Sequence, residues 1–366
     1  MSKAAQNSTP QLWARAAPKM RAALRAWYLR HRRPLPWRAQ PSLYKTVVSE
    51  FMLQQTQVET VLPYFARWLK KFPDFKTLAA ARERDVLRLW EGLGYYRRAR
   101  LLHALAREIA PLPSPPRTPA AWLALPGVGP YTAAAITSIS FGEPAAVVDG
   151  NVVRVLARLL GDDTLFKDGT SAVKTFQTPA NILLNTTHPG DHNQAVMELG
   201  ATVCTKHKPH CPICPLKRWC AAAKDGNPES LPRFAAKTTT RINLTRLWIE
   251  RNGTLLLHRR PASSRRLANV CELPEASILP DAIITLQPLA IKRRTITTQL
   301  FIESIHRTTL PPSAPVLSKE FVWANATMLK RLTLSGPHRR WIAELRENLV
   351  RSSLGLFTGG LPNGGQ

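Results

Sequence analysis

The sequence lacks long apolar segments and has few acidic side chains. None of its apolar runs approaches the ~20 residues that a membrane-spanning helix requires, which argues against a membrane partner. The N-terminal segment lacks a continuous apolar stretch followed by a small-residue cleavage site, so we do not expect a secretory signal. Among 366 residues, 24 Asp and Glu stand against 51 Lys and Arg, giving a formal net charge of +27. This imbalance favours a nucleic-acid partner over a merely solvated basic surface.

The excess positive charge is distributed over the whole chain. Residues 1–225 carry 31 Lys and Arg against 15 Asp and Glu, and residues 226–366 carry 20 against 9. Both halves can therefore face a polyanion. Hydrophobic residues make up 44% of the sequence, enough to bury a core in each of two domains, which excludes a disordered polycation.

The hydrophobic pattern changes once along the chain and predicts a multi-domain protein. From Trp13 to Ala223, apolar residues three and four positions apart predict an all-α domain. Beyond a polar stretch with two prolines, RINLTRLWIE, an Asn252-Gly253 turn and TLLLHRR predict a hairpin of an α+β domain. A later strand is expected in TITTQLFIESI and a closing helix near residues 337–350. The predicted boundaries are a disordered N-terminus (1–10), a helical domain (11–224), a linker (225–240), the α+β domain (241–350) and a disordered tail (351–366).

Cysteine is scarce, and four of the five cysteines lie close together in the chain. Their spacing, Cys204-x6-Cys211-x2-Cys214-x5-Cys220, predicts a metal site in a reducing compartment rather than a set of disulfides. An iron–sulfur cluster and a four-cysteine zinc site both remain open on spacing alone, although zinc usually takes two close cysteine pairs set further apart. Cys271 lies outside this group, and we expect it to be a buried apolar thiol.

A glycine-containing turn precedes a helix in LPGVGPYTAAAI, residues 125–136. Gly127 and Gly129 bracket the turn, and Pro130 suits the first position of the helix that follows. Backbone N–H groups at such a turn can bind a phosphate without any side-chain charge. An ordinary corner between two helices is the alternative.

Two carboxylates have the sequence context of an acid–base pair. Glu50 has apolar neighbours on a predicted helix, so we expect burial to raise its pKa. Asp149 opens a predicted helix in VVDGNVVRVLARLL, where an ordinary N-cap is the alternative interpretation. One protonated and one ionised carboxyl group are what the cleavage of a glycosidic bond requires.

Together these motifs resemble the endonuclease III superfamily of helix–hairpin–helix DNA glycosylases, over most of residues 10–225. SEFMLQQTQV, GLGYYRRAR and the extra C-terminal domain are similar to MutY-type adenine DNA glycosylases. The resemblance implies removal of adenine mispaired with guanine or 8-oxoguanine from double-stranded DNA in base excision repair, after the base has left the helix. It also implies a Nudix-like lesion-recognition domain at the C-terminus and a [4Fe–4S] cluster held by Cys204, Cys211, Cys214 and Cys220. We expect a monomer that is cytoplasmic and associated with the nucleoid, as in bacteria.

The resemblance also implies roles for individual residues. Glu50 would protonate adenine N7 and then position the attacking water, and Asp149 would stabilise the positive C1′. Tyr131 and Asn151 would orient this pair. The bifunctional enzymes of the superfamily carry a lysine where this chain has Tyr131, and a phenol cannot form the Schiff base that permits strand cleavage. We therefore expect a monofunctional glycosylase, with a bifunctional glycosylase/lyase or a non-catalytic mispair-binding module as alternatives.

Further residues match DNA-contacting positions of the family. Gln55 and Tyr95 correspond to residues that wedge into the base stack, with a surface amide and a core tyrosine as the alternatives. Gly127 and Gly129 correspond to the phosphate-binding hairpin. The residues that correspond to the adenine pocket are Arg33, Trp37, Arg38, Leu53 and Gln194.

The C-terminal domain matches the family less closely. Where the family carries a Phe-Ser-His loop that reads 8-oxoguanine, this sequence has Ile296 followed by Thr297 and Thr298. Thr297 keeps a hydroxyl group for lesion recognition, whereas the aromatic ring and the histidine are missing. Arg293 and Arg294 beside this loop could hold phosphate or be solvated. Residues 271–288 contain no glutamate-rich helix of the kind that holds Mg²⁺ in Nudix hydrolases, so we reject pyrophosphate hydrolysis.

Overall fold

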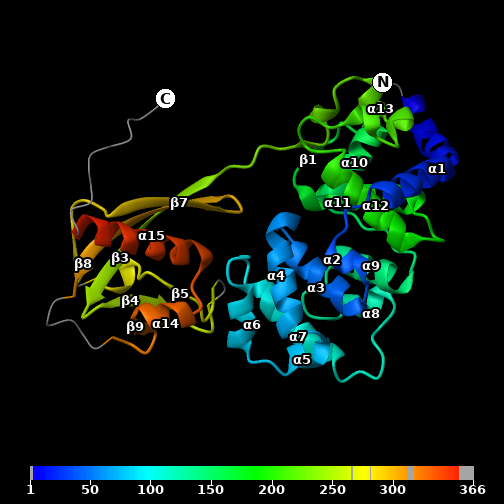
Figure 1. The fold of residues 1–366 in the computed structure, drawn as a ribbon. Coiled ribbons are helices and arrows are strands. Elements are labelled where there is room, and N and C mark those ends of the chain that lie inside the picture. Colours follow the sequence, from blue (N-terminus) through cyan, green and yellow to red (C-terminus); the bar gives the residue numbers. More distant parts are fainter. Residues whose placement is uncertain (1–2, 265–266, 281, 311–316, 354–366) are drawn as a thin grey trace. The chain divides into compact units, whose positions relative to one another are not determined.

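The computed structural model describes residues 3–264, 267–280, 282–310 and 317–353, which form two compact units (Figure 1). The first unit consists of the described residues up to Ala80 together with Leu101–Ala236. The second consists of Ala81–Arg100 and the described residues from Lys237 onwards. The chain therefore contributes a short internal segment to the second unit, which the hydrophobic pattern does not indicate.

The first unit is mainly helical, as the apolar periodicity predicts. Its helices are α1 (Lys3–His31), α2 (Pro36–Ala39), α3 (Leu43–Leu53), α4 (Val58–Lys71), α5 (Phe75–Ala79), most of α7 (Arg97–Ile109), α8 (Pro119–Leu123), α9 (Pro130–Phe141), α10 (Gly150–Leu160), α11 (Gly169–Leu183), α12 (Pro189–Thr202), the 3-10 turns η1 (Cys211–Ile213) and η2 (Lys217–Trp219), and α13 (Ala221–Lys224). Side chains of Ser42, Asp74 and Thr118 cap α3, α5 and α8 by accepting a backbone N–H of the first turn.

Helix α1 begins earlier than the sequence predicts. It starts at Lys3, inside the segment 1–10 for which the sequence predicts disorder. The early residues Ala4, Ala5 and Gln6 favour a helical backbone, which explains the extension. Residues 1 and 2 lie outside the described part of the chain.

The core of the first unit lies between α1, α9, α10, α11 and α12. At most 1% of each of the following residues is exposed, one from each helix in turn: Leu24, Ala135, Leu156, Phe176 and Leu199. This packing fixes α10 beside α12, so that residues from the start of α10 and from α12 can contribute to one site.

The predicted linker, residues 225–240, contains short regular segments. It includes η3 (Pro228–Ser230) and β2 (Arg233–Phe234), and β2 pairs in parallel with β1 (Leu165–Phe166). The N–H of Ala235 also donates to the carbonyl oxygen of Phe166 at 2.9 Å. The first half of the linker is therefore attached to the helical unit by backbone hydrogen bonds.

The second unit is a mixed β-sheet covered by helices. Its elements are α6 (Glu83–Trp90), β3 (Thr240–Arg251), β4 (Thr254–Arg259), β5 (Cys271–Glu272), η4 (Ala276–Ile278), β6 (Ile283–Ile284), β7 (Ala290–Ile296), β8 (Gln299–Thr309), β9 (Phe321–Ala324), α14 (Ala326–Arg331) and α15 (Gly336–Ser353). β3 runs parallel to β8 and turns at the predicted Asn252-Gly253 pair into the antiparallel β4. β5 and β9 pair with β4, and β6 and β7 pair with β8. α15 lies against one face of the sheet (Figure 1).

The end of the chain differs from the prediction in one respect. The segment TITTQLFIESI is not a single strand, because Thr297 and Thr298 form a two-residue turn between β7 and β8. Thr297 has a left-handed backbone with φ +56°, which such a hairpin turn requires. The predicted closing helix is confirmed as α15, whereas residues 354–366 of the predicted tail lie outside the described part.

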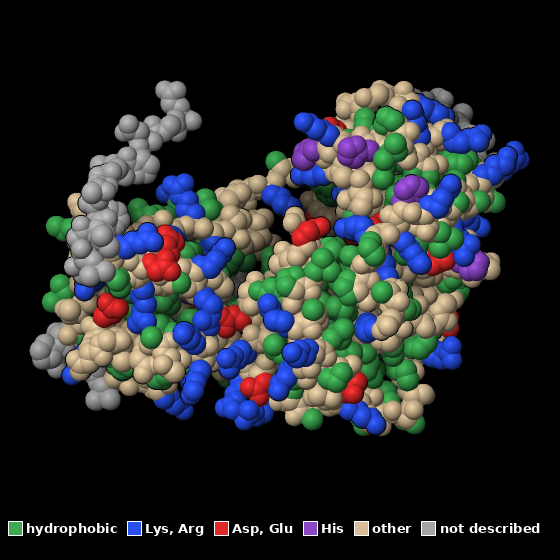
Figure 2. Space-filling view, in the orientation of Figure 1, with side chains coloured by type: hydrophobic (Ala, Val, Ile, Leu, Met, Phe, Trp, Pro, Cys, Tyr) green, Lys and Arg blue, Asp and Glu red, His purple; other side chains and the backbone are tan. Residues whose placement is uncertain are grey.

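Positive charge is a surface property of both units. Lys and Arg side chains are spread over the face seen in the space-filling view, with few Asp and Glu among them (Figure 2). None of the helices in the described ranges combines the length and hydropathy of a membrane-spanning segment.

Candidate active site

Glu50 lies on the buried side of α3. Only 7% of it is exposed, and its apolar neighbours on the helix are fully buried: Val47, Val48, Phe51 and Met52. Burial raises the pKa of Glu50 to about 7, and the nearby Asp149 also raises it. A hydrogen bond with Tyr131 and the charge of Arg38 lower it in part. Near neutral pH, Glu50 is therefore divided between its acid and carboxylate forms.

Asp149 is the N-cap of α10, as the alternative interpretation of the sequence predicts. Its Oδ1 accepts the N–H of Val152 at 2.8 Å, and its Oδ2 accepts the Nδ2–H of Asn151 at 3.3 Å. Burial raises the pKa of Asp149, while these donors and Arg154 lower it in part. The capping role and an active-site role are compatible, because capping fixes the orientation of the carboxylate beside Glu50.

Tyr131, at the start of α9, lies close to both carboxylates. It shares a hydrogen bond with Glu50, and its hydroxyl lies 3.0 Å from the Sδ of Met197. Burial, followed by the charges of Glu50 and Asp149, raises the pKa of Tyr131 well above its usual value, so it is a neutral phenol. The structure thus brings Glu50, Tyr131, Asp149 and Asn151 together from α3, α9 and α10.

Three of the predicted pocket residues form one hydrogen-bonded group around Glu198 of α12. Glu198 accepts a bond from Arg33 Nε at 2.7 Å and from Arg38 Nη2 at 3.0 Å. Arg38 Nε also donates to Gln194 Oε1 at 3.1 Å. Burial alone would raise the pKa of Glu198, but its bonds to the two arginines lower it overall. The group is close enough to Glu50 for the charge of Arg38 to lower the pKa of Glu50.

Glu198 is a residue of this group that the sequence analysis missed. It follows Gln194 by four positions, which places both side chains on one face of α12. Its side chain is only 1% exposed. An acidic residue at that spacing within the apolar helix NQAVMELG is the signal that could have identified it, as it did for Glu50.

The other predicted residues of the first unit differ in exposure. Trp37 is buried and packs edge-on against Phe65, with ring centroids 5.1 Å apart. Leu53 is half-buried at the end of α3. Gln55 is exposed, with a left-handed backbone at φ +59°, immediately beyond that helix. Gln55 therefore projects from the surface, whereas Trp37 is only 8% exposed.

Helices α8 and α9 with their connecting turn form the predicted helix–hairpin–helix. Gly127 has φ +76°, and an added Cβ would lie 2.7 Å from Leu101 Cβ and 2.9 Å from Phe51 Cε1. Only glycine fits at this position without a shift of the packed side chains. Gly129 is the N-cap of α9, and nothing described lies within 4 Å of an added Cβ there. A side chain at Gly129 would therefore meet open space at the start of α9.

Tyr95, Thr297 and Thr298 belong to the second unit. Tyr95 is 49% exposed, so the alternative of a core tyrosine is wrong for this residue. The buried tyrosine is its neighbour Tyr96. Thr297 is exposed at the tip of the β7–β8 hairpin, and Thr298 beside it is half-buried.

Arg294 points into the interior of the second unit. Its Nε lies 2.5 Å from Glu303 Oε1, and its Nη1 lies 3.5 Å from Glu272 Oε1. Both glutamates also pair with Arg246, which is 2% exposed. Arg294 thus belongs to a buried ion cluster, which corrects the suggestion that it holds phosphate or is solvated, while Arg293 is exposed.

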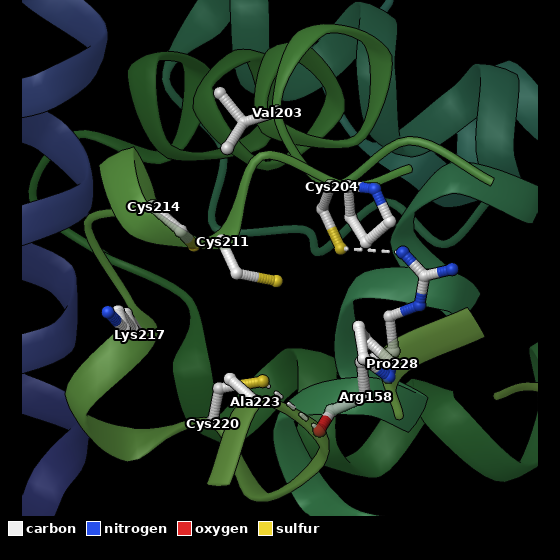
Figure 3. A pocket seen from close by; sticks show the side chains of 10 residues that line it. Arg158, Val203, Cys204, Cys211, Cys214, Lys217, Cys220, Ala223 and Pro228 are labelled. Carbon is white, nitrogen blue, oxygen red and sulfur yellow. Dashed lines mark hydrogen bonds between the residues drawn. The ribbon is translucent and has the colours of Figure 1, made fainter. Parts of the chain in front are cut away.

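The four clustered cysteines line a single cavity (Figure 3). Cys204, Cys211, Cys214 and Cys220 reach it from the loop after α12 and from η1 and η2. Within the described ranges, no three His, Cys, Asp or Glu side chains are close enough together to share one metal ion. The four thiols line one shared space (Figure 3).

Arg158 brings a positive charge to this cavity. It is 2% exposed, and its Nη1 lies 3.5 Å from the Sγ of Cys204. Its guanidinium also donates to the carbonyl oxygens of Thr205, Lys206 and Leu231, at 2.6, 3.0 and 3.0 Å. A fixed cation in this place offsets the charge of cysteine thiolates.

Arg154 connects the cysteine loop with the start of α10. Its Nε donates to the carbonyl oxygen of Cys204, and its Nη2 donates to Asn151 Oδ1, both at 2.8 Å. The same Nη2 reaches the carbonyl oxygen of Gly200 at 2.7 Å. The partner of Asp149 and the cysteine loop are therefore held by one side chain.

Comparison with known families places the helical unit among DNA repair proteins. The profile of the "HhH-GPD superfamily base excision DNA repair protein" matches residues 48–175. This segment contains Glu50, Tyr131 and Asp149. The helical unit thus has the fold of that superfamily.

Curated relatives match the same part of the chain. It is 40% identical over 231 residues to the adenine DNA glycosylase of Schizosaccharomyces pombe, covering 57% of this chain and 50% of the relative. It is 41% identical over 204 residues to the adenine DNA glycosylase of Mycolicibacterium smegmatis, covering 54% of this chain and 69% of the relative. The chain spans about half the length of the first of these relatives. Among solved structures, a thermostable thymine-DNA glycosylase aligns at 27% identity and a TM-score of 0.49, covering 57% of this chain and 99% of that one.

Proposed function

The chain belongs to the adenine DNA glycosylase family, and we propose that it removes adenine mispaired with guanine or 8-oxoguanine from double-stranded DNA. The reaction is hydrolysis of the N-glycosidic bond, the first step of base excision repair. One observation carries the proposal: Glu50, a buried carboxyl group with a pKa of about 7, lies beside Asp149, a carboxylate oriented by two hydrogen bonds. Such a pair is what glycosidic cleavage requires.

Glu50 is the proposed general acid. With a pKa of about 7 it is partly protonated at neutral pH and still acidic enough to transfer its proton. Protonation of adenine at N7 converts a poor leaving group into a neutral one, a step worth a factor of ~10²–10⁴ in rate. The resulting Glu50 carboxylate then positions the attacking water. Its hydrogen bond with Tyr131 keeps the carboxylate in orientation.

Asp149 is the proposed anion that faces the sugar as positive charge develops at C1′. The N–H of Val152 and the amide of Asn151 hold it in place. Tyr131 occupies the position at which a Schiff-base lysine would serve a lyase, and its phenol cannot form an imine. The proposed enzyme is therefore monofunctional and leaves an intact strand with an abasic site.

Adenine must leave the duplex before these groups can reach it. Gln55 and Tyr95, both exposed, are the proposed wedges that enter the base stack. Backbone N–H groups near Gly127 and Gly129 are proposed to hold the phosphates. The extruded adenine is proposed to contact Arg33, Trp37, Arg38, Leu53 and Gln194.

We propose a [4Fe–4S] cluster in the cysteine cavity. Cys204, Cys211, Cys214 and Cys220 would hold it, because all four line one cavity and their spacing lacks the second close pair that a zinc site usually has. Bound there, the cluster would brace the basic loop that follows α12.

The second unit is the proposed Nudix-like lesion-recognition domain. Its mixed sheet with α15 on one face supports this assignment. Thr297 and Thr298 at the hairpin tip are the proposed contacts to the base opposite adenine. We propose a monomer associated with the bacterial nucleoid, in keeping with its net charge of +27.

The experiment that tests the function uses a labelled duplex with adenine opposite 8-oxoguanine. We expect strand breaks only after hot alkali, because a monofunctional enzyme leaves an alkali-labile abasic site. Breaks without alkali would favour a bifunctional glycosylase/lyase, and tight binding with no breaks would favour a mispair-binding module. A Glu50→Gln variant should bind the duplex and release no adenine, and Glu108→Gln, at an exposed helix position, is the matched control.

The cofactor is tested on the purified protein itself. We expect a brown protein with about four irons per chain and no stoichiometric zinc. Replacement of Cys204 by Ser should lower the iron content. A colourless preparation that contains zinc would contradict the assignment.

A further inference from the structure

The turn that carries Tyr95 has an unusual backbone. Between α6 and α7, Gly92, Gly94 and Tyr95 all have positive φ, at +103°, +76° and +48°. Glycine adopts this conformation freely, but a bulky aromatic residue does not. Strained positions of this kind persist only where surrounding contacts enforce them, and they concentrate at functional sites.

Arg98 provides these contacts. It lies in the first turn of α7 and is only 7% exposed. Its Nη2 donates to the carbonyl oxygens of Leu93 and Gly94, each at 3.3 Å, and its own N–H donates to the carbonyl oxygen of Tyr95 at 2.8 Å. The indole N–H of Trp90 also donates to the carbonyl oxygen of Gly94, at 3.0 Å. Residues on both sides of the turn, Trp90 and Arg98, therefore hold its backbone by hydrogen bonds.

The guanidinium of Arg98 also contacts two aromatic rings. Its Cζ lies 5.3 Å from the ring of Trp90 and 5.5 Å from the ring of Tyr95. Trp90 is fully buried, whereas Tyr95 is 49% exposed. A buried cation on an aromatic face is attracted more strongly than an exposed one, because water does not screen it. The Tyr95 ring is therefore held from within while much of its surface faces solvent.

We propose that Arg98 is a positioning residue that presents the Tyr95 ring to the base stack of DNA. This inference rests on the proposed function, because it assumes that Tyr95 enters the duplex. Arg98 does not touch the DNA in this scheme. Its bonds to the turn and its contact with the ring fix the ring before binding, so that ordering it on the DNA costs less binding free energy.

The geometry also explains why an arginine stands here. Lysine would keep a charge but lacks the planar group that can lie on a ring while its nitrogens reach two carbonyl oxygens. An apolar residue would avoid the cost of burying a cation but would leave these carbonyl oxygens without this donor. Arginine is the side chain that meets both requirements of the turn.

A double-mutant cycle between Arg98 and Tyr95 tests the proposal. The measurements are duplex affinity and the fluorescence rise of 2-aminopurine in place of the target adenine, which reports base extrusion without cleavage. Arg98→Met should weaken extrusion about 10-fold with Tyr95 present and less than 2-fold in a Tyr95→Leu background. Arg97→Met, at the exposed neighbouring position, should behave as wild type in both backgrounds apart from a small loss of affinity.

Two outcomes would overturn the inference: equal losses in both backgrounds, or no loss for Arg98→Met. If Arg98→Met does not fold, Arg98→Lys takes its place in the same cycle, with a smaller loss expected because the charge is kept. Tyr95→Phe should retain full coupling, since the ring and not the hydroxyl contacts the guanidinium. The proposed function is judged separately, from adenine release by the wild-type protein.

Discussion

The hydroxyl of Tyr96 donates a hydrogen bond of 2.9 Å to the carbonyl oxygen of Leu334, a residue 238 positions later in the chain. Arg339 likewise pairs with Glu91, and Arg100 donates to the carbonyl oxygen of Ala268. These contacts explain why Ala81–Arg100 groups with the C-terminal sheet and not with the helices on either side of it in sequence. The segment that carries Tyr95 therefore packs with the C-terminal sheet, although it lies within residues 48–175, which match the glycosylase profile.

Replacing Tyr96 by Phe should destabilise the second unit. The bond to Leu334 is buried, so its loss leaves a carbonyl oxygen unsatisfied, at a cost of about 1–3 kcal/mol. Urea unfolding followed by fluorescence measures the change. Tyr95→Phe, which removes an exposed hydroxyl, is the control, and equal stability of the two variants would contradict the structural role of this bond.

Glu50→Gln should stabilise the protein at alkaline pH. The pKa of Glu50 is raised from about 4.5 to about 7 in the folded state, so its stabilising contribution is full below pH 4.5 and is lost as pH rises through 7. The glutamine variant avoids this loss. The free energy of unfolding of this variant should exceed that of the wild type by up to about 3 kcal/mol at pH 8, and the difference should decrease to zero near pH 4.5. Thermal unfolding across this pH range measures the stability difference, with Glu108→Gln as the control. A difference that does not change with pH would contradict a raised pKa of Glu50.

Arg38→Met should shift the alkaline limb of the activity profile to higher pH. The positive charge of Arg38 lowers the pKa of Glu50, so its removal raises that pKa and keeps the general acid protonated at higher pH. Absolute activity should decrease, because Glu198 and Gln194 lose a partner. Single-turnover rates between pH 6 and 9 give the midpoint of the limb. An unchanged midpoint for Arg38→Met would contradict this assignment. Arg32→Met, at an exposed position, is the control and should leave the midpoint unchanged.

Gly127→Ala should destabilise the hairpin more than Gly129→Ala does. An alanine Cβ at 127 meets the packed Leu101 and Phe51 and is strained at φ +76°, which together cost about 2 kcal/mol or more. At 129 the same group meets open space. Denaturant unfolding compares the two variants. Comparable stability of the two would show that the hairpin adjusts freely at Gly127.

The parts of the site that sequence could predict are those encoded over short distances. The cysteine spacing, the glycines of the hairpin and the Asn252-Gly253 turn depend on residues that are near neighbours in the chain. Glu50 was recognisable because its helical neighbours are apolar. Glu198 has the same kind of signal, but only the tertiary structure shows that it pairs with Arg33 and Arg38.

The amino-acid sequence by itself determined the helical unit, the hairpin after β3, the surplus of positive charge and the family resemblance, because all of these are written in local composition and spacing. Only the tertiary structure decided that burial raises the pKa of Glu50 to about 7 beside Asp149. It also decided that the Arg294 side chain lies in a buried ion cluster and that Ala81–Arg100 packs with the C-terminal sheet. Each of these depends on desolvation or on a contact between residues distant in sequence, and no local pattern records which distant side chains will meet.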